Sequence, residues 1–278
     1  MSKDSPFVSV IIPSLDGYCK GNVPKLLESL KQQSFQDFEV IVMKGDKRQG
    51  RAINAGVKKA KGEVLIILDD DTILGHKDVF RNLLEVINND ATIGMAGVAN
   101  LIPPDAPWLV RRAMKELPRR SSKLVQKITD SDMAEHPCCA IPRKIFLEIG
   151  GESEVIPRGL DPYLRHKIRQ AGYRVVVIPD TWIHHLLPNS FWTIMRRCLK
   201  NGKTAAYCNK FYPELIYNLS HRHNQQVRPR IPLIWRIFRY LYRMLLAFIS
   251  LRWIWLSAQI CNGLGFIWGW VFVKKEDI

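Results

Sequence analysis

Three consecutive aspartates, Asp69, Asp70 and Asp71, are the side chains in this sequence best suited to chemistry. They follow the run 63–68, which after its first glutamate contains only Val, Leu and Ile and predicts a buried strand of a parallel sheet. Open α/β sheets bind ligands at the carboxyl ends of such strands, and clustered carboxylates suit Mg²⁺ or Mn²⁺, which can hold a diphosphate. The alternative is a solvated acidic turn in which Asp71 and Thr72 form the N-cap of a following helix.

Strands and helices are predicted to alternate over the first hundred residues. Apolar runs typical of strands occupy 7–13 and 38–43, and the spacing of apolar side chains indicates helices over 23–33 and 51–61. The connections between these segments are short, which favours βαβ units on a parallel sheet. The predicted fold class is therefore α/β, with a Rossmann-like, mostly parallel sheet flanked by helices.

Several short segments, in this order, resemble the family 2 glycosyltransferases. In the first half they are residues 8–13, 39–42, 54–56, 61–63 and 68–71. Those that resemble the acceptor half of the same family are residues 150–151, 159–164, 169 and 172–173. The resemblance covers about residues 7–190 and implies a GT-A type fold, a nucleotide-sugar donor, a divalent metal ion and inversion at the anomeric carbon.

The resemblance also implies roles for individual residues near the donor. Asp69 would lie near the donor ribose, Asp70 fills the variable position of an Asp-x-Asp pattern, and Asp71 would hold the metal ion on the diphosphate. A metal ion there would neutralise the negative charge that grows on the departing diphosphate. Further candidate donor-binding residues, in or beside the matching segments, are Pro13, Ser14 and Asn54.

The same resemblance identifies Asp161 as the general base that takes the proton from the acceptor hydroxyl. Because Asp followed by Pro is a good helix start, Asp161 also fits the N-cap of a helix over 162–171, and the two roles are compatible. In the family a histidine six residues after the proline of the next strand often completes the metal site, which indicates His185, with His184 as the alternative. If the strand continues, these two side chains point to opposite faces, so only one of them can reach the metal.

Two positions depart from the family pattern. Leu160 precedes the base, where the family usually has an acidic residue, so a second carboxylate is missing there. The family's second strand usually runs into an acidic pair near the nucleotide base, but here the first acidic residue after that strand is Asp46, which fills this role only if the loop is a few residues longer. The donor nucleotide (UDP, GDP or dTDP) is therefore left open.

The composition points to a lipid or lipid-linked partner more than to nucleic acid. The chain of 278 residues is 47% hydrophobic, enough for one full core, and has a formal net charge of +15. Basic residues gather at 111–127 and in the carboxyl tail without a helix-turn-helix, zinc or RNA-binding signature, which favours anionic head groups or a diphosphate-lipid acceptor. Six cysteines without Cys-x-x-Cys spacing and a polar amino terminus without a signal sequence favour a cytoplasmic catalytic domain.

The carboxyl tail predicts membrane attachment. The segment 233–250 is apolar except for Arg236, Arg239 and Arg243, whose spacing places them on one face of a basic interfacial helix. The uncharged segment 253–273 has tryptophans near both ends and the length of a membrane span. Its glycines and amides leave three alternatives open: a core helix, a dimer helix or a re-entrant hairpin.

We therefore predict a catalytic domain over 1–220, with a nucleotide-sugar half at about 7–100 and an acceptor half at about 101–220, and a membrane-attachment tail over 221–278. The predicted function is inverting transfer of a sugar, at the cytoplasmic face of a membrane, to a hydroxyl of a lipid-linked or envelope-glycan acceptor. The alternatives are a polyprenyl-phosphate sugar synthase and a catalytically inactive, membrane-bound nucleotide-binding scaffold. The enzyme is preferred over the scaffold because all four expected catalytic and metal-binding side chains, Asp69, Asp71, Asp161 and His185, are present.

Overall fold

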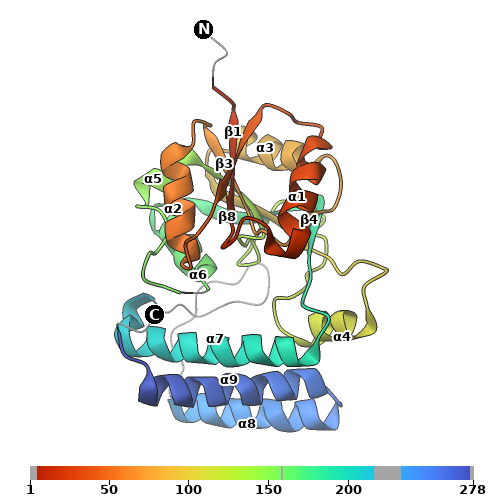
Figure 1. The fold of residues 1–278 in the computed structure, drawn as a ribbon, viewed down its shortest axis with the longest axis vertical. Helices are drawn as coiled ribbons and strands as arrows, with labels where there is room; N and C mark the ends of the chain where they lie inside the picture. Colours follow the sequence, from red (N-terminus) through yellow and green to blue (C-terminus); the bar gives the residue numbers. More distant parts are fainter. Residues whose placement is uncertain (1–4, 158, 216–232, 276–278) are drawn as a thin grey trace. The chain divides into compact units, whose positions relative to one another are not determined.

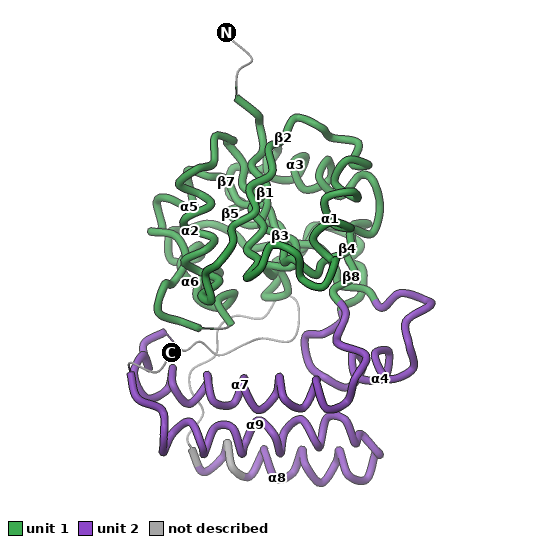
Figure 2. Tube along the Cα trace, viewed as in Figure 1, with its two compact units in different colours: residues 1–101, 122–185, 220–225 green, residues 102–121, 186–219, 226–278 purple. Residues whose placement is uncertain are grey.

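The computed structural model describes residues 5–157, 159–215 and 233–275 (Figure 1). The chain forms two compact units, which Figure 2 shows in different colours. Unit 1 comprises residues 1–101, 122–185 and 220–225, and unit 2 comprises residues 102–121, 186–219 and 226–278. This division differs from the predicted boundary near residue 220, because two segments of the predicted acceptor half belong to unit 2.

The described part of unit 1 contains an eight-stranded mixed sheet. In the sheet the strands follow the order β2 (Phe38–Met43), β1 (Val8–Pro13), β3 (Val64–Leu68), β7 (Cys138–Pro142), β5 (Ile93–Asn100), β8 (Arg174–His185) and β4 (Thr72–Leu74), and β6 (Thr129–Asp130) pairs with β8. β1 is parallel to β2 and β3, and β5 is parallel to β8, but β7 is antiparallel to both of its neighbours. The prediction of a mostly parallel sheet therefore holds for β1, β2 and β3 and for the pair β5 and β8, whereas β4, β6 and β7 pair antiparallel and make the sheet mixed.

Helices cover both faces of this sheet. They are α1 (Asn22–Lys31), α2 (Gln49–Lys59), α3 (Val79–Asn89), α5 (Arg143–Glu148) and α6 (Asp161–Gln170), with a short 3₁₀ turn η1 (Cys19–Gly21). Alternation sends Val10 and Ile66 to the face covered by α1 and α3, and Ile11 and Ile67 to the face covered by α2, α5 and α6. Because both faces are covered, β3 is buried along its whole length, as its uninterrupted apolar sequence predicts.

The three aspartates do not lead into a helix. The Thr72 amide donates to the Asp69 carbonyl over 3.1 Å, which turns the chain into the short strand β4. Thr72 pairs with His185 of β8, and its hydroxyl donates to the Pro137 carbonyl over 2.7 Å. The alternative that Asp71 and Thr72 form a helix N-cap is therefore wrong, because strand pairing uses this segment instead.

Unit 2 is helical where it is described. Its helices are α4 (Trp108–Glu116), α7 (Phe191–Phe211), α8 (Leu233–Ile249) and α9 (Trp253–Phe272), with a 3₁₀ turn η2 (Pro213–Leu215). The backbones of α7 and α9 approach closely at glycines: a Cβ atom would lie 2.0 Å from the Asn262 carbonyl oxygen if added at Gly202, and 2.1 Å from that of Leu199 if added at Gly265. Glycine is costly in an isolated helix, but in α9 it permits this packing.

A separate hydrophobic core explains why α4 and α7 belong to unit 2. It is formed by apolar side chains of α4, α7 and α9, among them Val110, Ala113, Met114, Ile194, Met195, Ile254 and Ala258. None of the helices in the described residues, α9 included, combines the length and the apolar character that crossing a bilayer requires.

Candidate active site

Asp69, Asp71 and His185 come together where β3 and β8 end. One possible ligand atom from each of the three residues lies within 4.8 Å of the others, and His185 Nε2 is 3.0 Å from Asp71 Oδ1. The pairing of β4 with β8 produces this arrangement, because it places Thr72 directly beside His185. Two residues far apart in the sequence are thus held at one point by strand register.

The two adjacent histidines have different surroundings. His184 Nδ1 lies 2.8 Å from the Leu101 carbonyl oxygen, whereas the His185 backbone amide donates to Asn100 Oδ1 over 3.0 Å. Neighbouring side chains of a strand point to opposite faces, so the ring of His185 reaches the aspartates and that of His184 does not. Of the two candidates, His185 is the one with the geometry of a ligand.

The three side chains fit a divalent cation. Two carboxylate oxygens and one imidazole nitrogen form a mixed donor set of the kind that Mn²⁺ accepts, whereas Mg²⁺ more often takes oxygen ligands and water. Gln49, at the start of α2, donates from Nε2 to Asp69 Oδ1 over 2.7 Å and so orients that carboxylate. Sequence reasoning did not identify Gln49, and the metal role of the cluster stays a prediction.

Burial raises the pKa of Asp69 to about 6, partly offset by His185 and His136, while Asp71 and Asp161 raise it further. A protonated carboxyl does not bind a cation, so protons compete with the metal below this pH. We expect the affinity of the free protein for Mn²⁺ to fall by about tenfold per pH unit below about pH 6. Calorimetric titration between pH 5 and 8 measures this, and an Asp69→Asn variant should bind more weakly and lose this part of the pH dependence. An affinity independent of pH in the unchanged protein would contradict the assignment.

The loop after β1 lies beside the aspartates. Pro13 is the last residue of β1, the Ser14 amide donates to the Met43 carbonyl over 2.9 Å, and Ser14 Oγ accepts from Gly17 over 3.2 Å. These bonds shape the chain that leads into η1. In η1, burial and the nearby Asp70 and Asp71 raise the pKa of the Cys19 thiol to about 11. This thiol therefore lies next to the aspartates, a position that the sequence did not indicate.

Asp46 and Asn54 have partners within the protein. Asp46 Oδ1 lies 2.8 Å from a nitrogen of the Arg51 guanidinium, which is the main cause that lowers the pKa of this carboxyl. The Asn54 amide nitrogen donates to the Glu152 carbonyl over 3.0 Å, and Asn54 Oδ1 accepts from the Glu152 amide over 2.9 Å. Asn54 therefore ties α2 to the loop after α5, and the donor-binding roles of both residues stay predictions.

Asp161 is the first residue of α6, and its side chain is bound by His136. Asp161 Oδ1 accepts from the His136 backbone amide over 2.7 Å and lies 2.9 Å from His136 Nδ1. Leu160 is the N-cap residue, without a side-chain cap hydrogen bond, so the prediction that Asp161 caps the helix is wrong. The Asp161 side chain remains 23% exposed, which leaves it accessible to a substrate.

The surroundings of Asp161 keep it ionised. Burial raises the pKa of Asp161, but His136 and Arg165 outweigh this effect and hold it well below its usual range. Asp161 and His136 are also among the groups that change the pKa of Asp69, so the predicted base lies near the aspartate cluster. The structure thus brings together, at one place in unit 1, all four side chains on which the predicted chemistry depends.

His136 and Glu152, like Gln49, are residues at this site that sequence reasoning missed. His136 Nε2 lies 2.6 Å from Glu152 Oε1, and both side chains are almost fully buried. Nothing in the sequence distinguishes His136, an isolated histidine before a strand. Glu152 directly follows Gly150 and Gly151 of the matching acceptor block, and this is the one signal that pointed towards it.

An α/β unit with an acidic cluster beside a histidine and a nearby carboxylate agrees with the resemblance of the sequence motifs to the family 2 glycosyltransferases. The family model of glycosyl transferase family 2 matches residues 11–150, and the chain belongs to this family, as its motifs predicted. A glycosyltransferase of Haemophilus influenzae that is described as uncharacterized is 28% identical over 190 residues, which cover 56% of this chain and 59% of that protein. The chain thus spans about three-fifths of the length of this curated relative.

Solved structures share the fold. The mannosyltransferase PcManGT from Pyrobaculum calidifontis, in complex with GDP-Man and Mn²⁺, matches 97% of this chain and 88% of its own, with a TM-score of 0.63 and 14% identity. S. aureus TarS 1–349 with UDP-GlcNAc matches 72% of this chain and 70% of its own, with a TM-score of 0.50 and 13% identity. GalNAc-T7 with UDP, GalNAc and Mn²⁺ matches 66% of this chain and 44% of its own, with a TM-score of 0.50 and 17% identity. At these identities the likeness shows the GT-A fold alone.

Proposed function

We propose that this protein is a metal-dependent, inverting glycosyltransferase that moves a sugar from a nucleotide sugar to a hydroxyl acceptor. The observation that carries the proposal is the cluster of Asp69, Asp71 and His185 with Asp161 close by. Membership of glycosyl transferase family 2 supports the reaction class. The class of donor and cofactor is supported by GDP-Man and Mn²⁺ in PcManGT, UDP-GlcNAc in TarS, and UDP, GalNAc and Mn²⁺ in GalNAc-T7.

Each residue has a defined part in this proposal. Asp71 and His185, with Asp69 beside them, would hold the metal ion, which when bound supplies positive charge to the diphosphate leaving group. Gln49 fixes the orientation of Asp69. The Asp161 carboxylate, ionised and partly exposed, accepts the proton of the acceptor hydroxyl. A single attack by a hydroxyl assisted by one base inverts the configuration at the anomeric carbon.

Unit 2 supports a lipid surface as the place of reaction. Its helices α8 and α9 expose many large apolar side chains, among them Ile234, Trp235, Phe238, Leu241, Leu245, Phe248, Leu264, Ile267, Val271 and Phe272. Soluble monomers rarely expose so many neighbouring apolar groups, and such a surface marks contact with a membrane or a partner. We therefore propose that unit 2 lies on a membrane, with nucleotide sugar supplied from the cytoplasm and a lipid-linked or envelope-glycan acceptor.

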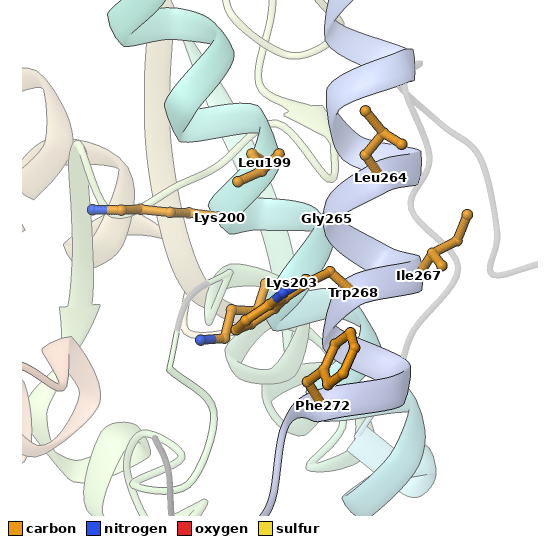
Figure 3. A pocket seen from close by; sticks show the side chains of 8 residues that line it. All are labelled: Leu199, Lys200, Lys203, Leu264, Gly265, Ile267, Trp268 and Phe272. Carbon is orange, nitrogen blue, oxygen red and sulfur yellow. The ribbon is translucent and has the colours of Figure 1, made fainter.

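A groove between α7 and α9 adds to this argument. It has a volume of about 550 Å³ and is lined by Leu199, Lys200 and Lys203 of α7 and by Leu264, Gly265, Ile267, Trp268 and Phe272 of α9 (Figure 3). The Lys203 ammonium lies 4.3 Å from the centre of the Trp268 ring. Apolar walls with lysines and no acidic residue suit an anionic amphiphile such as a lipid phosphate.

The two described arginine side chains of α8 give a direct test of lipid binding. Arg239 and Arg243 are exposed and one helical turn apart, and like charges at this spacing repel unless an anionic surface is near. Because each basic residue near an anionic membrane contributes about 1 kcal/mol, reversing both charges should weaken binding to vesicles by about thirtyfold or more. Vesicle co-sedimentation with phosphatidylglycerol present measures this. Reversal of Lys58 and Lys59, exposed in α2, makes the same charge change and should have little effect, and equal loss in both variants would refute the assignment to α8.

The reaction itself is tested with the purified full chain, Mn²⁺ and UDP-, GDP- and dTDP-sugars. We expect one nucleotide class to be released, and the release to rise when a lipid extract containing the acceptor is added. Binding of a nucleotide sugar without turnover on any acceptor would favour the inactive scaffold. Turnover with polyprenyl phosphate as the sole acceptor would identify the alternative lipid-phosphate synthase.

A further inference from the structure

A buried chain of three titratable side chains connects Glu152 to the proposed base. Glu152 Oε1 lies 2.6 Å from His136 Nε2, and His136 Nδ1 lies 2.9 Å from Asp161 Oδ1. The exposed fraction rises along this chain, from 0% for the Glu152 side chain to 2% for His136 and 23% for Asp161. Of these three side chains only Asp161 is open to solvent, so only Asp161 can contact the acceptor.

We propose that His136, held by Glu152, is a positioning residue that fixes the Asp161 carboxylate for proton abstraction, an inference that rests on the proposed transferase function. Both hydrogen-bond donors of His136, the backbone amide and Nδ1, converge on Asp161 Oδ1. Among the described residues none donates to Asp161 Oδ2. One oxygen is therefore anchored, and the other is available to the acceptor hydroxyl.

Asp161 and Glu152 together favour the protonated state of the His136 imidazole. Each ring nitrogen of His136 faces a carboxylate oxygen within 3 Å, and an imidazole donates to two acceptors only when both nitrogens carry a proton. Burial lowers the pKa of His136, but Asp161 and Glu152 together raise it well above its usual value. The two contacts therefore favour an imidazolium between Glu152 and Asp161, although burial also raises the pKa of Glu152, and Asp69 and Arg165 are further charged groups near the same site.

This arrangement also accounts for the departure at Leu160. The family pattern usually supplies a second carboxylate next to the base, and here that position is a buried leucine. Glu152 provides a second carboxylate from another loop, acting on the base through His136 and not directly. A buried charged chain of this kind is costly compared with apolar side chains of the same volume, which indicates a role beyond packing.

A matched pair of variants tests the positioning role. His136→Asn places an amide nitrogen near the position of Nδ1 and keeps a donor towards Asp161, whereas His136→Gln places it near Nε2, towards Glu152. Both remove the ring and its charge, and both leave the backbone amide in place. We expect His136→Gln to lower kcat by about ten- to hundredfold, the range typical of residues that orient a catalytic group. His136→Asn should keep most of the activity that His136→Gln loses, because it still donates towards Asp161.

Two further measurements separate positioning from simple structural damage. Without the imidazolium the pKa of Asp161 rises, so the acid limb of the kcat profile should move to higher pH in His136→Gln. The Kd for the donor with Mn²⁺ should stay unchanged when it is measured at pH 8, well above the pKa of Asp69. Because His136 acts through Asp161, the double variant His136→Gln, Asp161→Asn should be no slower than Asp161→Asn alone.

Multiplied losses in the double variant, or equal activities of the Asn and Gln variants with an unmoved acid limb, would overturn the positioning role. A His136 variant that no longer binds donor and Mn²⁺ is misfolded, and Glu152→Gln is then used in its place. The acid limb of the Glu152→Gln kcat profile should also move to higher pH, and its loss of activity should not add to that of Asp161→Asn. Failure of the proposed function is recognised separately, because the unchanged protein would then transfer no sugar at all.

Discussion

Replacing Asp71 with alanine is expected to reduce sugar transfer by three orders of magnitude or more. Asp71 Oδ1 lies 3.0 Å from His185 Nε2, so this side chain is central to the candidate metal site. Removing it leaves the charge of the departing diphosphate uncompensated, and metal ions contribute several kcal/mol to such transition states. Donor binding in the presence of Mn²⁺ should weaken as well, which calorimetry and nucleotide-release assays measure together.

Asp70→Ala is the matched control for this experiment. It removes the same charge from the adjacent position, but Asp70 lies beside Cys19 and is not part of the ligand cluster. We expect a loss of no more than about tenfold, consistent with a change in local charge alone. Equal losses in the two variants, or full activity of the unchanged protein in EDTA, would refute the metal assignment.

Asp161→Asn is expected to lower turnover by two to four orders of magnitude, the contribution of a general base. The substitution keeps the shape of the side chain and its hydrogen bond with His136, but an amide does not accept the proton of the acceptor. The Kd for the donor should barely change. Asp130→Asn, at an exposed ion pair with Arg174, makes the same chemical change elsewhere in unit 1 and should leave turnover intact.

The same variant distinguishes the two acceptor classes. A hydroxyl must lose its proton as it attacks, whereas a lipid phosphate is already ionised at neutral pH and needs no base. A large loss in Asp161→Asn therefore supports the hydroxyl acceptor. A variant that keeps most of its turnover would instead favour the polyprenyl-phosphate synthase.

Local sequence pattern was sufficient for much of unit 1. The apolar runs that became β1, β2 and β3 were predicted to within one residue at each end, because short runs rich in Val and Ile favour strands, and the uninterrupted run of β3 favours a fully buried one. The ordered motifs indicated the family, and with it Asp69, Asp71, Asp161 and His185. Spacing alone also showed that only one of the two histidines could reach the aspartates.

Other features depended on contacts that no local pattern encodes. β7 lies between β3 and β5 and runs antiparallel to both, which made the sheet mixed. The segment after Asp71 became a strand because it pairs with the end of β8, and that register also selected His185 over His184. Glycines lower the helix propensity of the α9 sequence, but in the structure they allow the backbone of α9 to pack against α7.

The sequence by itself determined the α/β class, the family and the acidic cluster, because these follow from the order and type of neighbouring residues. Only the tertiary structure decided how the base is held. His136, Glu152 and Asp161 are 9 to 25 positions apart in the chain, and the loops that bring them within 3 Å have no periodic pattern. Their hydrogen bonds depend on the backbone positions that the sheet and α6 impose, so the contacts behind Asp161 are a product of the fold.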